Sequence, residues 1–462
     1  MRVTHLALTH FRSFSRLDLS LPIGSTVIWG DNGAGKSNLI ESLYLLATSR
    51  SPYTSAEREM IDWHCPHRPA FARVVGQVLR EGRVTSLEVL TAETDASTTP
   101  ADFEPSPDPG MYRPATVRRK VVINGTPRQT GELLGHLNAV HFSPEEVELV
   151  AGSAERRRRF LDIALSQLDR QYVRTLRQYQ RVLVQRNALL RHLRENPTVS
   201  PSQLDHWDTE AVFLGAAIVA ARIRAVARLN VHLALIDGIA PGAAPIRITY
   251  LSGVDLPNPA EGDSPFVRTI DAGDTLADDV ASRLRAAFAR QRTRERAAAI
   301  TLVGPHRDDL LVCAGVIDQR TYGSRGQQRT AALALKIAEA GLMREVTGEP
   351  PVLLLDDVMS ELDPTRRAFV EGLCADADQA IVTGTEEAVF SPAFPPRPLR
   401  VPFRNSPYRD GPTSSGARPT PITTASHRRL VGITPIRLPV RASTWIRSRM
   451  RCKSTIWNTA KS

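Results

Sequence analysis

The alternation of apolar and polar residues marks a β-rich section at the start of the chain. Over residues 1–24 apolar positions alternate with polar ones, which predicts two strands joined by a turn. Further strands are expected at 73–79, 85–90 and 118–125, the last of which enters an Asn-Gly turn. These strands predict a mostly β side sheet within residues 1–150.

Apolar residues recur at helical spacing over most of the following segment. One long helical pattern covers 155–193, a second covers about 204–229, and a turn with two prolines separates them. This order predicts an antiparallel helical hairpin. Residues 241–274 are irregular or strand-like, and 276–299 are helical again. We expect residues 151–300 to form an inserted, mostly helical domain.

A glycine-rich loop lies between a predicted strand and a predicted helix. Residues 26–29 are apolar or β-favouring, residues 30–37 match G-x-x-x-x-G-K-[ST] at every fixed position, and apolar residues follow at helical spacing. This is the context that a phosphate-binding loop requires. A chance glycine-rich turn is the alternative, and the flanking strand and helix argue against it. The sequence therefore predicts a bound nucleoside triphosphate.

The residue types in this loop suit phosphate binding. Glycines let backbone N–H groups converge on phosphate oxygens, and a helix that begins near Lys36 directs the positive end of its dipole at the same anion. Lys36 is expected to bridge the β- and γ-phosphates of ATP, and the Ser37 hydroxyl is expected to hold Mg²⁺. The predicted ATP-binding residues of the loop are Gly30, Asp31, Asn32, Gly33, Ala34, Gly35, Lys36, Ser37 and Asn38.

The other half of the predicted site lies far along the sequence. Residues 352–355 predict a buried strand that delivers Asp356 to Mg²⁺, and Asp357 follows where a carboxylate can orient the attacking water. Lys36 and Asp357 are the candidate catalytic residues. Because Lys36 and Asp356 lie 320 residues apart, we expect one ATPase domain that is split by the helical insertion.

A second loop of small residues precedes a helix. Residues 322–329 lead into a strong helical pattern at 330–343. Small residues and glutamine at a helix N-terminus can form an anion site, whereas an ordinary helix cap is the alternative. The candidate residues are Ser324, Arg325, Gly326 and Gln327.

Arginines are dense on the first long helical pattern, where few acids offset them. This pattern favours a phosphate-contacting surface for DNA, and a solvated helix face is the alternative. The candidate DNA-binding residues are Arg156, Arg157, Arg158 and Arg159, and further arginines stand at 170, 174, 177 and 181.

The net charge of +10 comes from the C-terminal segment. From residue 391 onward twelve Arg and two Lys face a single acid, so the first 390 residues carry about −3. The basic isoelectric point is therefore weak evidence about the folded body. Residues 391–462 are rich in Pro, Arg, Ser and Thr and lack periodicity, which predicts a disordered basic tail. Such a tail could add electrostatic affinity for DNA, or it could be an altered C-terminus without a role.

Composition also bears on the compartment. The four cysteines lack pairing or metal-ligand spacing, which is typical of a reducing environment. The longest apolar run, 212–221, is too short to span a bilayer, and no signal segment opens the chain. We expect a soluble, cytoplasmic protein without a membrane partner.

Several motifs resemble a known class when they are taken in chain order. The phosphate loop, S-R-G-Q-Q before a helix, L-L-L-D-D and S-E-L-D are similar to the ATPase heads of the SMC class of ABC-type proteins. Finer elements resemble the RecF family of bacterial recombination mediators, over about residues 1–385. These elements are F-R-S-F at 11–14, F-S-P-E-E at 142–146, R-R-R-F-L-D at 157–162, Q-R-N at 185–187, G-P-H-R-D-D at 304–309 and T-G-T at 383–385.

The resemblance implies a fold and a mode of action. The expected fold is α/β, an ABC/SMC-type P-loop ATPase head formed by 1–150 and 301–390, with a β side sheet and the inserted helical domain. Arg12 would approach the nucleotide. Two heads would dimerise head to tail on ATP, so that the Ser324 loop of one subunit caps the γ-phosphate bound by the other, with Asp363 near the interface.

The function implied by the resemblance is DNA repair. Slow ATP hydrolysis would time a clamp on single-stranded DNA or gapped duplex, and RecR and RecO would help to load RecA in repair, replication restart and the SOS response. Another SMC-like head, which organises chromosomes or serves a nuclease, is the nearest alternative. An ABC transporter ATPase and a metabolic P-loop kinase are more distant ones.

Overall fold

A parallel sheet of five strands forms the centre of the structure, with the order β14-β3-β13-β12-β8. The computed structural model describes residues 1–94, 117–236, 239, 244–254, 273–384 and 397–399. Every position of β8, β12 and β13 is buried, as expected for parallel strands covered on both faces. The strands are β3 (Gly24–Trp29), β8 (Ala139–Phe142), β12 (Val352–Leu355), β13 (Gln379–Gly384) and β14 (Arg397–Leu399).

Successive residues of these strands face two different hydrophobic cores. Ile28 and Leu354 point to a core that includes α1 (Lys36–Thr48) and the side sheet. Val27 and Leu355 point to a second core, shared with α8 (Arg325–Thr347), α9 (Pro364–Ala375) and the long helices of the insertion. The central sheet thus joins the two parts of the chain that carry the predicted site.

The predicted side sheet is confirmed as six antiparallel strands in the order β2-β1-β4-β5-β6-β7. Its close approach to α1 needs Gly76, because a Cβ there would lie 2.5 Å from Leu46 Cδ1. The strands are β1 (Arg2–Phe11), β2 (Phe14–Ser20), β4 (Phe71–Arg80), β5 (Arg83–Glu93), β6 (Val117–Ile123) and β7 (Thr126–Arg128).

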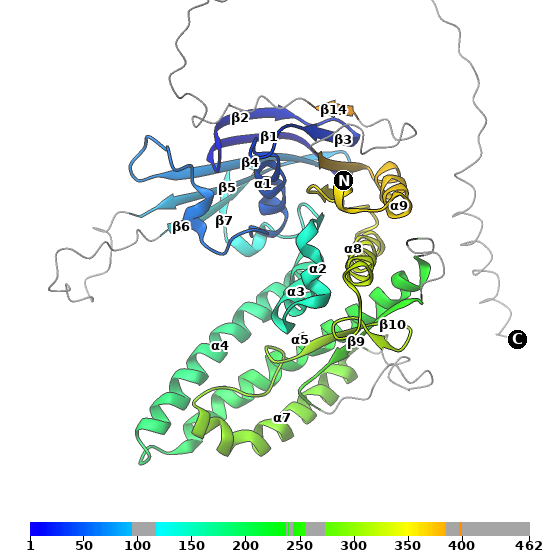
Figure 1. Ribbon diagram of the computed structural model, residues 1–462. Coiled ribbons are helices and arrows are strands. Elements are labelled where there is room, and N and C mark those ends of the chain that lie inside the picture. The colour runs from blue at the N-terminus through cyan, green and yellow to red at the C-terminus, as the bar shows by residue number, and fades with distance from the viewer. Residues whose placement is uncertain (95–116, 237–238, 240–243, 255–272, 385–396, 400–462) are drawn as a thin grey trace, which may run out of the picture. The chain divides into compact units, whose positions relative to one another are not determined.

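The predicted helical hairpin is also present. Figure 1 shows α4 (Arg170–Glu195), α5 (Leu204–Leu235) and α7 (Gly273–Ala298) side by side, in agreement with their packing contacts. The prediction of one helix over 155–193 is wrong, since α3 (Ala154–Leu168) ends before α4 begins. Asp169 causes the break: its extended backbone caps α4, and its side chain accepts a 2.7 Å hydrogen bond from the Gln171 N–H.

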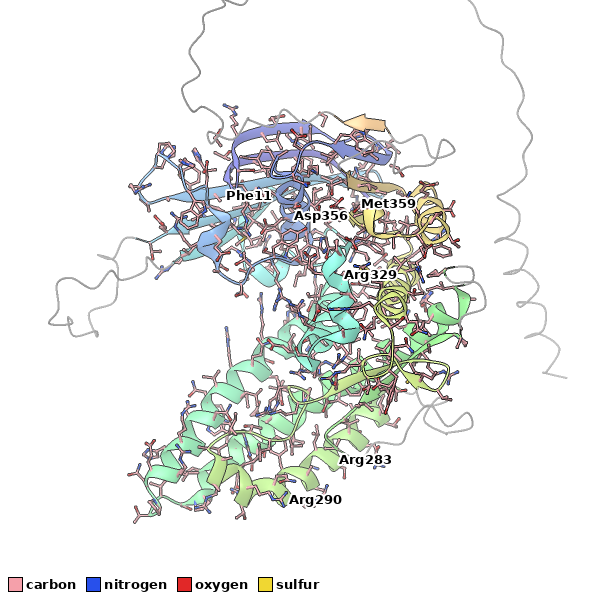
Figure 2. All side chains as sticks on the ribbon, viewed as in Figure 1. Phe11, Arg283, Arg290, Arg329, Asp356 and Met359 are labelled. Carbon is pink, nitrogen blue, oxygen red and sulfur yellow. The ribbon has the colours of Figure 1, made fainter. Side chains whose placement is uncertain are left out.

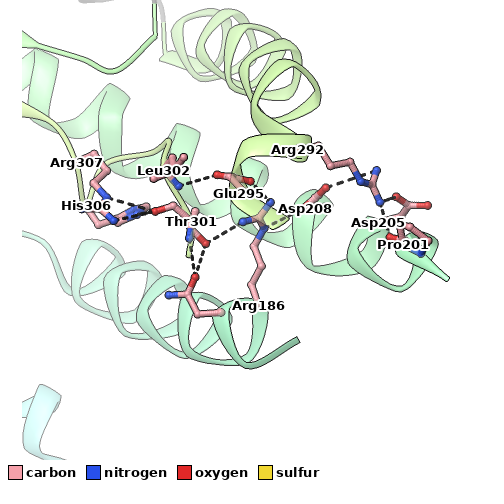
Figure 3. Close-up of polar contacts among 11 residues, drawn as sticks. Arg186, Pro201, Asp205, Asp208, Arg292, Glu295, Thr301, Leu302, His306 and Arg307 are labelled. Carbon is pink, nitrogen blue, oxygen red and sulfur yellow. Dashed lines mark hydrogen bonds and ion pairs between the residues drawn. The ribbon is translucent and has the colours of Figure 1, made fainter. Parts of the chain in front are cut away.

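A buried ion network holds the hairpin to α7 (Figure 3). Arg186 of α4 is fully buried and donates to Asp208 of α5 at 2.8 Å, to Glu295 of α7 at 2.6 Å and to the Thr301 hydroxyl at 2.8 Å. Its guanidinium also lies 4.7 Å from the centre of the Phe288 ring. One side chain thus fixes three helices.

Two predicted boundaries differ from the structure. A small antiparallel sheet pairs β9 (Ile246–Leu251) with β10 (Asp309–Ala314), so contacts of the insertion extend past residue 300. Within the segment predicted to be disordered, residues 397–399 form β14 at the edge of the central sheet. The rest of the predicted tail lies outside the described residues.

The remaining short elements complete the chain order. Among the described residues, no helix has the length and hydropathy that a bilayer crossing requires. These elements are η1 (Glu57–Met60), η3 (Thr130–Glu132), η4 (Pro144–Glu146), α2 (Val147–Ala151), η5 (Pro201–Gln203), β11 (Ile317–Asp318) and η7 (Met359–Glu361).

Candidate nucleotide site

The glycine-rich loop connects β3 to α1 as predicted. Gly33 and Gly35 have φ values of 81° and 103°, a left-handed conformation that glycine adopts without strain. Gly35 is also the N-cap of α1, and a Cβ there would lie 2.7 Å from the Ser13 hydroxyl oxygen. In the described part of the chain no side chain caps this helix, so its first N–H groups are directed at the position of an anion.

Lys36 is buried and contacts its own loop. Its ammonium group donates to the carbonyl oxygens of Gly30 at 2.6 Å and Asp31 at 3.0 Å. Burial lowers the pKa of Lys36, and the nearby carboxylates of Asp357 and Asp356 oppose this shift. The ammonium therefore has weak partners that phosphate oxygens could replace.

Asp356 directly follows β12 (Figure 2). Its carboxylate accepts hydrogen bonds from three hydroxyl groups. Ser37 and Thr383 donate to its Oδ1 at 3.1 Å and 2.7 Å, and the Tyr53 hydroxyl donates to its Oδ2. The predicted Mg²⁺ ligands Ser37 and Asp356 are thus brought together from distant parts of the sequence. Tyr53 belongs to no motif in the sequence, and its hydrogen bond to Asp356 was not predicted.

The residues present fit a magnesium ion. Mg²⁺ prefers oxygen ligands and usually takes one or two from the protein, with waters and substrate phosphates as the others. The Ser37 hydroxyl and the Asp356 carboxylate supply two such oxygens beside the phosphate loop. Within the described ranges, no group of three or more His, Cys, Asp and Glu side chains is arranged to hold a metal ion.

Asp357 adopts an unusual backbone conformation at the edge of this site. Its φ of 51° is uncommon for a residue with a side chain, and such strain is typical of functional positions. The Asp357 N–H donates to the Thr383 hydroxyl at 3.0 Å, and the Ser360 hydroxyl donates to the Asp357 carboxylate at 3.3 Å. Its water-orienting role stays a prediction.

The second predicted loop caps α8. The Ser324 hydroxyl accepts from the Gln327 N–H at 3.3 Å, and the Gln327 side chain accepts from the Ser324 N–H at 2.8 Å. These two hydrogen bonds form an ordinary helix cap, as the alternative interpretation expects. Ser324, Arg325, Gly326 and Gln327 are nevertheless all exposed, which leaves their phosphate contact as a prediction.

A contact links α8 to the segment that follows Asp357. Arg329 of α8 forms a 2.6 Å ion pair with Glu361 of η7. Asp363 then caps α9 by accepting from the Arg366 N–H at 2.9 Å. Its predicted place at a subunit interface is untested.

Arg12 contacts a carboxylate beside the loop. Its Nε and Nη2 each donate to Glu41 of α1 at 2.8 Å, and its Nη1 donates to the Glu59 carbonyl at 2.8 Å. The neighbouring Ser13 accepts from Asn38 at 2.9 Å, so this turn lies against the phosphate loop. Contact between Arg12 and the nucleotide stays a prediction.

The four consecutive arginines do not share one surface. Arg157 is 1% exposed and makes a bidentate ion pair with Asp309, at 2.6 Å and 3.0 Å. The prediction of an exposed surface is therefore wrong for Arg157, because one face of α3 packs against β10. Arg156 and Arg159 are exposed, and Arg158 is half-buried with a 2.7 Å hydrogen bond to the Asp308 carbonyl.

A cleft of about 620 Å³ lies between the side sheet, the end of α1, and helices α3 and α4. Its basic lining residues are Arg50, Arg119, Arg158, Arg159, Arg177 and Arg222. Arg119 and Arg222 pair with Glu57 and Asp162, whereas no ion pair of Arg50 or Arg177 occurs among the described residues. Arg50 was missed by sequence reasoning, since an isolated arginine after a helix carries no signal.

Known proteins resemble this chain over most of its length. A family model described as RecF/RecN/SMC N terminal domain matches residues 2–405. A curated protein named DNA replication and repair protein RecF, from Chloroflexus aurantiacus, is 42% identical over 403 residues, covering 85% of this chain and 96% of the relative. The Enterococcus faecalis protein of the same name is 35% identical over 370 residues, 79% of this chain and 88% of the relative.

Solved structures agree with the sequence relatives. A structure of the recombination mediator protein RecF with ATP, in the RecFOR pathway, matches with a TM-score of 0.70 at 28% identity. The match covers 84% of this chain and 93% of that one.

Proposed function

The chain belongs to the RecF family, and from this premise we propose that it is an ATP-binding recombination mediator that acts in DNA replication and repair. One observation carries the proposal: the central sheet places Lys36, Ser37 and Asp356 together at the end of a phosphate loop. The similarity to ATP-bound RecF supports ATP as the nucleotide.

ATP binding follows from the exchange of weak partners. The γ-phosphate would replace the Gly30 and Asp31 carbonyls as the partner of Lys36, and the first N–H groups of α1 would hold the β-phosphate. Ser37 and Asp356 would hold Mg²⁺, which neutralises charge on the phosphates when it is bound. Asp357 would orient the attacking water.

Hydrolysis would serve as a switch between two assembly states. The exposed Ser324–Gln327 loop of one subunit would cap the γ-phosphate held by a second copy, so that ATP drives a head-to-tail dimer. The ion pair of Arg329 with Glu361 connects the helix of this loop to the segment after Asp357. The loop and the Asp357 segment would therefore respond together to ATP. Slow hydrolysis would then time the release of the dimer.

DNA is the proposed ligand of the basic cleft. Burial lowers the pKa of Arg177, and the positive charges of the nearby Arg50 and Arg181 lower it further. Phosphate groups of a bound nucleic acid would reduce the repulsion between such clustered cations. The candidate DNA contacts are therefore Arg50, Arg158, Arg159 and Arg177, in place of the four consecutive arginines predicted from the sequence. Arg156 stays a candidate outside the cleft.

The partners follow from the family and not from the geometry. We propose that the dimer holds single-stranded or gapped DNA and acts with RecR and RecO to load RecA, with a role in the SOS response. Cytoplasmic location would follow from this activity. No observation favours the transporter or kinase alternatives, and another SMC-like head is the secondary interpretation.

The test combines light scattering with binding of a gapped duplex, each with and without Mg²⁺-ATP. Wild-type protein should dimerise and bind DNA more tightly only with ATP. Lys36→Ala should lose about 100-fold or more in ATP affinity, about 2.7 kcal/mol, and stay monomeric. A wild-type chain that stays monomeric and ignores DNA with ATP would refute the proposal, and a Lys36→Ala variant with normal affinity would refute the role of the loop.

A further inference from the structure

The Tyr53 hydroxyl reaches the carboxylate at the centre of the nucleotide site. Tyr53 lies in the loop after α1, far from β12 in sequence, and donates to Asp356 Oδ2. Asp356 is 6% exposed, so each donor to it has few competitors from solvent.

The loop that carries Tyr53 is held in place from both sides. The Tyr53 N–H and the Thr54 N–H each donate to the Ser51 hydroxyl at 3.0 Å, and that hydroxyl donates to Glu41 of α1 at 2.5 Å. The Tyr53 ring meets the buried His141 ring edge to face, with centres 5.8 Å apart. The position of the Tyr53 hydroxyl is therefore fixed by the fold.

The two carboxylate oxygens of Asp356 have different partners. Oδ1 faces Ser37 and Thr383, so the edge that would serve a magnesium ion beside Ser37 is the Oδ1 edge. Tyr53 takes Oδ2, the oxygen on the other side. A hydroxyl on Oδ2 turns Oδ1 toward Ser37 without occupying the position of the metal, so Tyr53 orients Asp356 and does not compete with the ion.

We propose that Tyr53 is a positioning residue for the magnesium–ATP site, acting by holding the Asp356 carboxylate in register with the Ser37 hydroxyl. This inference rests on the proposed nucleotide site and adds a residue that no motif in the sequence marks. Partners that orient a metal-binding carboxylate typically contribute about 10-fold to 100-fold in metal affinity. The Tyr53 hydroxyl bonds Asp356 and lies 3.3 Å from His141 Nε2, and no contact of this hydroxyl with the phosphate loop occurs among the described residues. We therefore expect the effect on ATP binding to depend on the metal.

The experiment measures the ATP dissociation constant by calorimetry in excess Mg²⁺ and in EDTA, using the full chain. Tyr53→Phe keeps the ring against His141 and removes only the hydroxyl. In EDTA we expect its affinity for ATP to stay within about twofold of wild type. In Mg²⁺ we expect it to bind about 10-fold more weakly, at the lower end of the range for such partners.

Tyr44→Phe is the matched control. The Tyr44 ring also lies beside His141, with centres 5.4 Å apart, and no contact of its hydroxyl with Asp356 occurs among the described residues. This variant should match wild type in both media, and thermal unfolding of both variants shows that they are folded.

Three results would overturn the inference. Tyr53→Phe could match wild type in both media, which means that the hydroxyl orients nothing. It could bind ATP more tightly in Mg²⁺, which means that the hydroxyl competes with the ion. A wild-type protein that binds ATP equally in both media also contradicts it, whereas a wild-type protein that binds no ATP at all would refute the proposed function itself.

Discussion

The nucleotide site and the helical arm, which consists of α4, α5 and α7, both bury polar groups, but the partners of these groups differ in kind. In the arm, Arg186 has the carboxylates of Asp208 and Glu295 as partners, and Glu295 is fully buried. In the nucleotide site, the hydrogen-bond partners of Lys36 among the described residues are carbonyl oxygens of its own loop. A buried charge with charged partners stabilises one conformation, whereas a charge with weak partners can exchange them for a ligand. The two regions should therefore respond in opposite ways to mutation.

The largest effect is expected in the arm. Arg186→Met removes the cation and leaves Glu295 and Asp208 without it, which should lower the free energy of unfolding by about 3–5 kcal/mol. ATP affinity of the folded protein should not change. Urea unfolding measures the free energy of unfolding, and calorimetry measures the affinity for ATP.

Arg292→Met provides the matched control for this prediction. Arg292 pairs with Asp205 at 2.7 Å near the end of the same hairpin (Figure 3), and its contact with Asp208 is longer, at 3.9 Å. The Asp205 side chain is 61% exposed. Loss of an exposed pair should cost less than about 1 kcal/mol. Equal losses for the two variants would show that burial does not set the value of the Arg186 network.

The next largest effect is expected at Asp357. Asp357→Asn keeps the side-chain shape, and asparagine tolerates the observed φ of 51°, so the fold and ATP binding should persist. Hydrolysis should fall about 100-fold or more, about 2.7 kcal/mol in the barrier, and the ATP-bound dimer should accumulate. Phosphate release and light scattering check this. Normal hydrolysis would place the water-orienting role on another residue.

His306 lies beside the ion network of the arm and tests the comparison by pH (Figure 3). The His306 ring accepts from or donates to the Tyr179 hydroxyl at 2.9 Å and contacts the Thr301 carbonyl at 3.2 Å. Burial, together with the positive charges of Arg307, Arg158 and Arg186 and against the hydrogen bond to Thr301, lowers the pKa of His306 to about 4. The unfolded chain, with an ordinary histidine pKa of about 6.5, therefore binds more protons than the folded chain between pH 6.5 and 4.

The stability that neutral His306 contributes is complete above pH 6.5 and decreases as the pH falls toward 4. The loss should be about 2.4 kcal/mol between pH 7 and pH 4.5, and His306→Gln should remove that part of the pH dependence. Unfolding free energies of both proteins at pH 7 and pH 4.5 give the difference. Parallel losses in the two proteins would assign the pH dependence to other groups.

Local pattern was enough to predict most of the fold and the core of the site. The phosphate loop, the side sheet and the strand before Asp356 each have a periodicity or spacing with one physical cause. β8 was missed because its four residues, Ala139–Phe142, are too few to show a period. The burial of Arg157 and the contact of Tyr53 with Asp356 depend on which helix face and loop meet another segment, and a single sequence does not contain that information.

The smallest effect is expected in the basic cleft, whose arginines are the proposed contacts to DNA. Arg50→Ala combined with Arg177→Ala should weaken binding to gapped DNA about tenfold at low salt and reduce the slope of log affinity against log salt by about two, because two phosphate contacts are lost. Arg191 is exposed on α4 and lies about 21 Å further along this helix than Arg177. Arg191→Ala combined with Arg194→Ala removes the same charge and should change neither value. Equal losses in the two double variants would mean that DNA responds to the overall charge of the helix and that the cleft is not its binding site.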